Sequence, residues 1–259
     1  MRRLAIFVII LALIAIRGVD AANGIIITFK SAIFSTVAGA LTCTPTWTPT
    51  ANSLIVAFAS TSYASAPVDP TGITGHGLTY TALTLGTSTF PVAGTHKVSA
   101  WVAKAGASPT SVACVSTVSG TTTGGSIVEF EVVGADVSGT AAQAIQVSNA
   151  TNTGTSTTPT VTLATPTLTG NRAMTFVVVL ANAAPTTSGT WTLTAGAAGN
   201  YNTPATGVAA LFQNSSFNTA GAATTSSAEW RMVGIEIKSV KMGGPLMAGR
   251  RNMTVRGVH

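Results

Sequence analysis

Charged residues make up only 8% of this 259-residue sequence and aromatic residues 6%, and it has only two cysteines and three histidines. Residues that favour helices, such as Glu, Lys and Gln, are scarce, so long helices are not expected. Thr, Ser, Ala, Gly and Val dominate instead, which favours strands separated by turns. The composition predicts an all-β protein with an uncharged surface, as is typical of an extracellular or virion protein rather than a cytosolic enzyme.

The few histidines and cysteines argue against metal or nucleophilic chemistry. There is no Cys-x-x-Cys and no Cys/His cluster, so no structural zinc site is predicted. His76 lies in the Gly-rich stretch "GITGHGLTY" and is predicted to be a turn residue or a polar surface residue. His96 precedes a strand-like run and His259 is the last residue; with no Gly-x-Ser-x-Gly elbow, no Ser/His/Asp triad is expected. The sequence therefore predicts no catalytic residue, no metal and no cofactor.

Cys43 and Cys114 both lie in strand-like contexts, "ALTCTPTW" and "SVACVSTV". They could form one disulfide in an oxidising compartment, or remain two buried thiols. The sequence leaves both states open.

The net charge of +6 belongs to the two ends of the chain. Residues 1–30 contain four basic residues and one acidic residue, and residues 238–259 contain five basic residues and no acidic one. Residues 31–237 have four basic and six acidic residues, so the body has no basic stripe and specific nucleic-acid binding is not expected. We predict that residues 239–259 form a basic extended tail that docks on a partner through Arg250, Arg251 and Arg256.

The N-terminal segment, residues 1–24, has Arg2 and Arg3 near its start, an apolar run from Leu4 to Ile16, and small residues Val19 and Ala21. This layout is typical of a secretory signal peptide cleaved after Ala21, and the run is too short for a comfortable membrane span. If it is not cleaved, the segment would be an apolar anchor that packs against partner subunits or a membrane.

Residues 25–238 contain about a dozen short strand-like runs bounded by Gly, Pro, Asn and Ser. This pattern predicts one antiparallel, jelly-roll-like β-sandwich with extended terminal arms, rather than two domains. The two halves echo each other: "ANSLIVAFAS", "GLTYTAL", "VSAWVAK" and "IVEFEVV" parallel "GNRAMTFVVVLA", "TWTLTA", "GVAALFQ" and "RMVGIEIK". We expect two sheets whose apolar faces meet, with each half contributing to both.

The stretch "GGSIVEFEVVGAD" holds the acidic residues Glu129, Glu131 and Asp136. In a strand the two glutamates share one face and lie about 7 Å apart at the backbone, a spacing compatible with paired catalytic carboxylates. Neighbours on an open sheet face, however, do not flank a substrate bond. We therefore predict a solvated sheet face or a charge-protected edge strand, with Asp136 in the turn that ends the strand.

The aromatic residues divide into core and loop candidates. Trp101 and Trp230 alternate with small or polar neighbours and are predicted to be core anchors. Trp47 in "TPTWTPT" and Tyr201 in "GNYNTP" are predicted to lie in loops, where flat rings could stack on glycans.

An ordered series of short motifs carries a resemblance to a known module. "NSLIVAFAS", "ITGHGLTYTAL", "HKVSAWVAKAGASPTSVACVSTVSG", "SIVEFEVVGAD" and "SSAEWRMVGIEIK", over residues 52–238, resemble a β-sandwich module of bacteriophage virion proteins that also occurs in secreted bacterial proteins. The resemblance implies a non-catalytic, jelly-roll-like sandwich used for capsid decoration, fibres, tail attachment or adhesion. It carries over no catalytic residue, and both ends of the chain lie outside the shared pattern.

Together these observations predict a non-enzymatic structural protein on the virion surface, with other virion or surface subunits as partners and a homo-oligomeric state. The alternative is a secreted carbohydrate-binding or adhesion module whose signal peptide is cleaved and whose partners are cell-surface glycans.

Overall fold

The computed structural model describes residues 24–63, 70–84, 95–163, 170–202, 205–213, 219–223 and 227–240. In these ranges the chain forms strands β1 to β17, and a 3₁₀ turn, η1 (Ala142–Ala144), precedes β10. All of the strand pairs are antiparallel. The predicted all-β antiparallel sandwich is confirmed, although the strands outnumber the expected dozen. Within the same ranges, no helix has the length and apolarity to cross a membrane.

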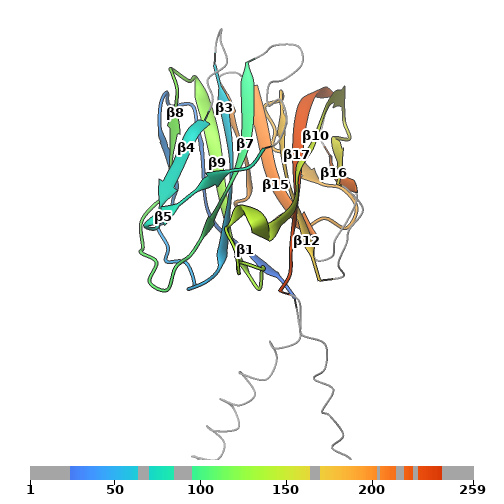
Figure 1. Ribbon diagram of the computed structural model, residues 1–259. Coiled ribbons are helices and arrows are strands. Elements are labelled where there is room, and N and C mark those ends of the chain that lie inside the picture. Colours follow the sequence, from blue (N-terminus) through green and yellow to red (C-terminus); the bar gives the residue numbers. More distant parts are fainter. Residues whose placement is uncertain are drawn as a thin grey trace, which may run out of the picture.

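The first half of the chain forms a sandwich of two sheets (Figure 1). Its inner sheet has the strand order β1-β9-β3-β7-β6, and its outer sheet has the order β2-β8-β4-β5. The bounds are β1 (Ile26–Ser35), β2 (Leu41–Thr42), β3 (Leu54–Ser62), β4 (Pro70–Gly75), β5 (Leu78–Thr79), β6 (Thr81–Ala82), β7 (His96–Lys104), β8 (Val115–Val118) and β9 (Gly124–Val133).

The second half forms another two-sheet sandwich. Its inner sheet has the order β10-β17-β12-β15-β14 and its outer sheet the order β11-β16-β13. The bounds are β10 (Ile145–Ser156), β11 (Thr160–Thr162), β12 (Arg172–Val179), β13 (Thr186–Thr187), β14 (Ala198–Asn202), β15 (Ala205–Gln213), β16 (Thr219–Ala223) and β17 (Ala228–Ile237).

The two halves share one topology. β5 pairs with β4 in the outer sheet, and β6 pairs with β7 in the inner sheet. β5 and β6 are therefore two parts of one strand that changes sheet at Tyr80. Counted in this way, each half has the inner order 1-8-3-6-5 and an outer order that begins 2-7-4, the two-sheet arrangement of a jelly roll. The predicted echo is therefore a repeated topology. The expectation that each half contributes to both sheets of one sandwich is wrong, because each half builds its own sandwich.

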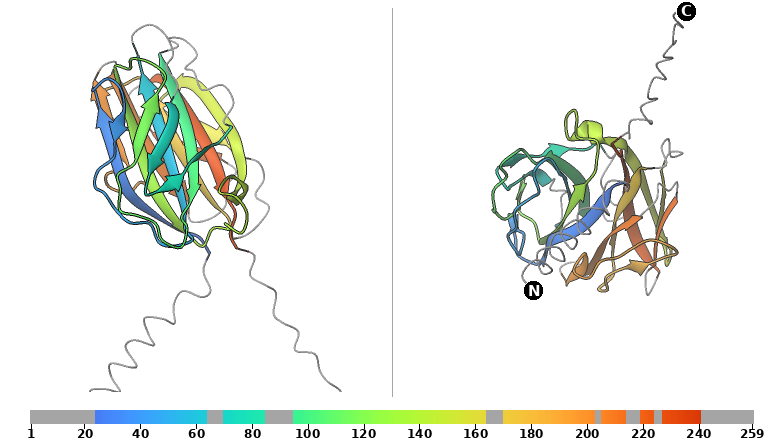
Figure 2. Two further views of the ribbon diagram at one scale, coloured as in Figure 1. Left: turned by 60° about the vertical axis from the view of Figure 1, so that its left-hand side comes forward. Right: turned by 90° about the horizontal axis from the view of Figure 1, so that it is seen from below.

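The two inner sheets pack face to face and enclose the central core, and the two sandwiches lie side by side when seen from below (Figure 2). Phe58 on β3 stacks on Phe176 on β12, with ring centroids 5.4 Å apart and planes 9° apart. Even-numbered residues of β3, such as Phe58, face the central core, and odd-numbered residues, such as Ala57, face the core of the first sandwich. β3 is buried along its whole length because both of its faces are covered, and its residues 54–59 are all apolar.

Strand register assigns equivalent positions in the two halves. Phe58 pairs with Ala100 and Val128, whereas Phe176 pairs with Ala210 and Val233. Counting along β9 and β17 from Val128 and Val233 makes Gly234 the equivalent of Glu129 and Glu236 the equivalent of Glu131. Where the chain returns from the outer to the inner sheet, Thr81 pairs with Val102 in the first half and Thr192 pairs with Phe212 in the second. Val102 and Phe212 occupy equivalent positions, so Thr81 is equivalent to Thr192. The residues that precede them, Tyr80 and Trp191, are therefore equivalent as well.

Polar contacts also join the halves at one edge of the central core. His96 on β7 is fully buried, and its Nε2 lies 2.8 Å from Oγ1 of Thr206 on β15. Its Nδ1 lies 3.0 Å from Oγ1 of Thr95. Burial lowers the pKa of His96 to about 4, so the ring is neutral near pH 7.

This histidine predicts acid sensitivity. The unfolded chain takes up the His96 proton near pH 6.5 and the folded chain only near pH 4, so the contribution to stability is complete above pH 6.5 and is lost as the pH falls to about 4. The difference between the two pKa values corresponds to a loss of up to about 3 kcal/mol. Urea unfolding from pH 7 to pH 4 should show a shallower decline for His96→Gln than for the wild type. Equal declines would contradict the assignment.

Candidate functional site

The site is built on β9, an interior strand of the first inner sheet, next to the edge strand β1. β9 pairs with β1 on one side and with β3 on the other, and the side chains of Glu129 and Glu131 face the outer sheet. Glu129 is 0% exposed and Glu131 is 4% exposed. The prediction of a solvated face or an edge strand is therefore wrong, because a second layer covers this face. Asp136 lies beyond the end of β9, as predicted, and accepts hydrogen bonds from the Ser138 backbone N–H and hydroxyl.

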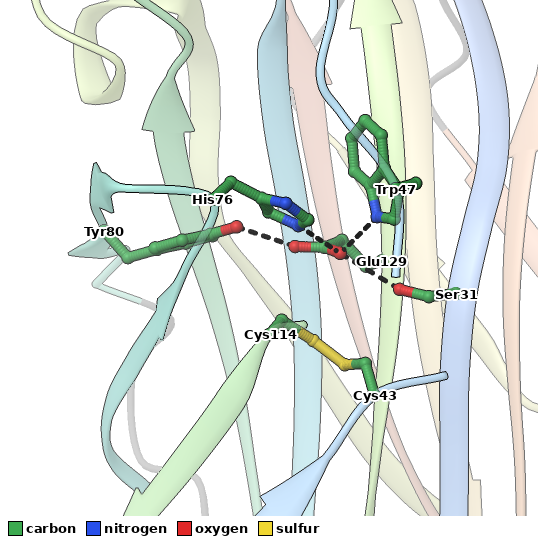
Figure 3. Close-up of polar contacts among 7 residues, drawn as sticks. All are labelled: Ser31, Cys43, Trp47, His76, Tyr80, Cys114 and Glu129. Carbon is green, nitrogen blue, oxygen red and sulfur yellow. Dashed lines mark hydrogen bonds and ion pairs between the residues drawn. A yellow bond between two sulfur atoms is a disulfide. The ribbon is translucent and has the colours of Figure 1, made fainter. Parts of the chain in front are cut away.

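The carboxylate of Glu129 is the centre of a buried polar cluster, which we call the Glu129 cluster (Figure 3). Four side chains contact its two oxygens. The Tyr80 hydroxyl donates to Oε1 at 2.6 Å, and Oε2 accepts from Trp47 Nε1 at 2.9 Å, from the Ser31 hydroxyl at 3.0 Å and from His76 Nε2 at 3.1 Å. Because an ionised carboxylate can only accept hydrogen bonds, Nε2 of His76 carries a proton in this arrangement.

Each donor comes from a different part of the first sandwich. Ser31 is on β1, and Trp47 is in the connection from β2 to β3. His76 is in the β4–β5 turn, and Tyr80 stands where that strand changes sheet. One carboxylate on the inner sheet thus holds the edge strand, a crossing loop and the outer sheet in place.

The β4–β5 turn explains how His76 reaches the interior. Gly75 pairs with Leu78, which leaves His76 and Gly77 as a two-residue hairpin loop. Their φ values are +55° and +68°, and two positive φ values define the type I′ turn that suits a tight hairpin. Histidine is one of the few non-glycine residues that are enriched at positive φ. His76 is a turn residue as predicted, but it is 0% exposed rather than at the surface.

Trp47 lies between the Glu129 cluster and an ion pair formed by Lys30 and Glu131. The centroid of the Trp47 ring lies 4.6 Å from that of His76 and 5.0 Å from Lys30 Nζ, which makes a cation–π contact with the indole. Lys30 Nζ also pairs with Glu131 at 2.8 Å. Glu131 accepts further hydrogen bonds from the Thr50 backbone N–H and from the Ser53 hydroxyl.

The cluster favours an ionised Glu129. Burial alone would raise the pKa of this carboxyl, but the hydrogen bonds from His76, Tyr80 and Trp47 outweigh burial and hold the pKa below its usual value. Burial, together with the adjacent carboxylate, raises the pKa of Tyr80, so its phenol remains a donor. With all four neighbours donating, the arrangement stabilises a fixed anion inside the sandwich and leaves it no contact with solvent.

The Cys43–Cys114 disulfide lies beside this anion (Figure 3). Cys43 follows β2 and Cys114 precedes β8, and the Cys43 N–H donates to the Cys114 carbonyl at 2.8 Å. Their Cα atoms are 5.2 Å apart, within the usual range for a disulfide, and both residues are 0% exposed. The pair that the sequence left open between a disulfide and free thiols is therefore bonded in this structure.

Among the residues that the structure describes, the second sandwich has no counterpart to this cluster. Glycine stands at position 234, where the first sandwich has Glu129, and the space above it is filled by Leu163 and Val161. Trp191 stands in place of Tyr80 and belongs to an apolar core. The same topology is thus completed with apolar packing, so the fold does not require the Glu129 cluster.

The residues that were predicted as core anchors or as binding residues lie in different surroundings in the structure. Trp101 and Trp230 are buried, as expected of core anchors. Tyr201 is not in a loop: it lies on β14, is 3% exposed and contacts the Ser60 hydroxyl, so its ring is closed to a glycan. Trp47 is half-buried, and its Nε1–H donates a hydrogen bond to Glu129. The contact of Trp47 with a glycan remains a prediction. Arg250, Arg251 and Arg256 lie outside the described residues.

Sequence reasoning did not find Ser31, His76 or Tyr80 as partners of Glu129. They come from three strands or turns, and only the closing of the outer sheet over β9 brings them together. The one available signal was "GHGLTY", in which a histidine with glycine on either side fits a tight turn.

No family model matches this sequence, and neither a curated protein nor a solved structure is significantly similar to it.

The turn geometry gives a paired prediction for His76. Asn tolerates positive φ, so His76→Asn should keep the turn but lose the hydrogen bond to the carboxylate and the ring contact with Trp47, at a cost of about 1.5 to 3 kcal/mol. His76→Ala should cost about 1 kcal/mol more, because alanine is strained at positive φ. Urea unfolding measures both variants. Equal stabilities for His76→Asn and the wild type would contradict a role for the imidazole.

Proposed function

We propose that this protein is a non-enzymatic structural component displayed on an assembled particle, most specifically an accessory protein of a phage virion. The observation that carries the proposal is that both ends of the folded body meet at one point. The Val240 N–H donates to the Gly134 carbonyl at 3.2 Å, and a Cβ placed on Gly134 would lie 2.6 Å from the Gly24 carbonyl oxygen. β1 begins and β17 ends at the same lower end of the molecule (Figure 1).

The two segments that adjoin this end differ in composition from the body. Residues 1–23 are apolar and basic, and residues 241–259 are basic and contain no acidic residue. Residues 31–237 have a slight acidic excess. An anchoring function at one end of a long sandwich leaves the opposite end free for display. The jelly-roll topology supports the same proposal, because jelly rolls occur in viral capsid proteins.

A tail-neutralising experiment tests this proposal. Full-length protein with Arg250, Arg251 and Arg256 replaced by glutamine should associate less with particles in sedimentation, with the association of the wild type falling steeply as salt is raised. Lys104→Gln is the matched control, since it removes one charge from the exposed surface of the body. Equal sedimentation of the triple variant and the wild type would contradict a docking function for the tail.

The second candidate is a secreted glycan-binding module, which the lectin use of jelly rolls and the signal-peptide layout of residues 1–21 support. A variant of the half-buried Trp47 tests this glycan-binding candidate. A glycan array should then show binding that Trp47→Phe weakens, with stability measured in parallel because Trp47 also contacts Glu129. Absence of binding by the wild type would end this candidate.

A further inference from the structure

Three metal-ligating groups meet in the interior of the first sandwich. The Sγ atoms of Cys43 and Cys114 and a carboxylate oxygen of Glu129 all lie within 4.8 Å of one another, and all three residues are 0% exposed. His76 Nε2 lies 3.1 Å from Oε2 of the same glutamate. The two sulfur atoms and the carboxylate oxygen are therefore arranged around one point, and the His76 imidazole adjoins the carboxylate.

We propose that the reduced protein binds a thiophilic divalent cation, of which Zn²⁺ is the type, through Cys43, Cys114 and Glu129. Thiolate and carboxylate are both ligand types of protein zinc sites, and sites with three protein ligands complete the tetrahedron with a small molecule such as water. At zinc bond lengths, ligand atoms in a tetrahedron lie about 3.4 to 3.8 Å apart. The sulfur atoms would separate on reduction and the carboxylate would approach, which are shifts of side chains rather than of strands.

The charge balance favours the cation once the disulfide is open. Glu129 has no exposed surface, and its carboxylate accepts hydrogen bonds from four neighbouring donors. Two thiolates would add two more negative charges in the same space, which is costly without a cation. A divalent ion offsets most of that charge, so thiolate formation and metal binding would occur together.

The chemistry consists of two balanced steps. A dithiol or a phosphine with water supplies two electrons and two protons, which break the Cys43–Cys114 bond and give two thiols while the reductant becomes a disulfide or a phosphine oxide. The metal ion then displaces the two thiol protons, which are released to solvent, and two metal–sulfur bonds form. Oxidation of the two sulfurs reverses the sequence and expels the ion.

The sequence alone predicted no zinc site, because metal-binding cysteines are usually sought as close pairs. Here the two cysteines are 71 residues apart and face each other across the neighbouring strands β2 and β8. The equivalent position in the second sandwich has Gly234 against Leu163 and Val161. Within the described residues the site therefore belongs to the first half, and metal binding would give the buried carboxylate a function that the topology itself does not require.

The test uses the full-length wild-type protein, reduced with a phosphine under argon and titrated with Co²⁺ and then with Zn²⁺. We expect one Co²⁺ per chain with thiolate-to-cobalt charge-transfer absorption, displacement of that absorption by Zn²⁺, and no binding by the oxidised protein. Bound Zn²⁺ should also slow re-formation of the disulfide by at least about tenfold. These measurements need no variant, so they do not depend on a substituted chain being able to fold.

Variants then assign the ligands. Cys43→Ser with Cys114→Ser should abolish the charge-transfer band, and Glu129→Gln should weaken Co²⁺ binding by about tenfold or more. Glu131→Gln, on the same face of β9 but outside the ligand set, is the matched control and should bind like the wild type. The proposal is overturned if the reduced wild type shows two free thiols but no cobalt–thiolate band, or if the Glu129→Gln and Glu131→Gln variants bind equally.

Discussion

Glu129→Ala is expected to lower the free energy of unfolding by about 3 to 5 kcal/mol, as removal of one partner from a buried charged network does. The substitution leaves four side chains, Ser31, Trp47, His76 and Tyr80, without the acceptor that they share. A buried donor without a partner costs about 1 to 3 kcal/mol, and neighbouring donors do not add independently. Urea unfolding followed by tryptophan fluorescence gives the measurement.

Two companion variants separate the charge from the packing. Glu129→Gln keeps the shape and one acceptor oxygen, so it should lose less than Glu129→Ala. Glu131→Ala, two residues along the same face, loses an ion pair with the partly exposed Lys30 and the hydrogen bonds from Thr50 and Ser53, so it should cost less than Glu129→Ala, about 1 to 2 kcal/mol. A loss below about 1 kcal/mol for Glu129→Ala would mean that the cluster does not hold the outer sheet in place.

Phe58→Ala is expected to cost about 3 to 5 kcal/mol, the usual range for deleting a buried phenylalanine. Phe58 is fully buried between the two inner sheets and loses both the core volume and the stacked contact with Phe176. Because this pair joins the two sandwiches, the variant should also unfold less cooperatively. Calorimetry should therefore show a calorimetric enthalpy larger than the van't Hoff enthalpy.

The matched control is Phe34→Ala. Phe34 packs against the same central core but is only partly buried, so its removal should cost less and leave unfolding cooperative. If Phe58→Ala and Phe34→Ala had equal effects, the stacked pair at the centre of the interface would not be what joins the sandwiches.

The fold class could be predicted from the sequence because strand and turn chemistry is local. "SLIVAFAST" predicted the buried strand β3. The echo between the halves corresponds to a repeated topology, although the prediction drawn from it, one sandwich to which both halves contribute, is wrong. The number of layers could not be predicted in this way. The apolar run of residues 54–59 in β3 indicates that both faces of the strand are covered, but it does not show which segments of the chain cover them.

The candidate site was misread for the same reason. Alternation along β9 correctly placed Glu129 and Glu131 opposite Phe130, but it could not reveal that the outer sheet covers their face. Polar residues facing a buried layer and polar residues facing water give the same pattern. The contacts of Tyr80 and His76 with Glu129, which only the folded structure shows, identify this face as buried.

Mass spectrometry of purified particles from the source organism, compared with the cleared culture medium, tests the proposed function most directly. We predict that the chain is found in the particle fraction, with peptides from the basic tail that contains Arg250 and Arg251. Absence of the chain from particles, or its recovery only from the medium in a form that begins near Ala22, would contradict the proposal and favour the secreted module.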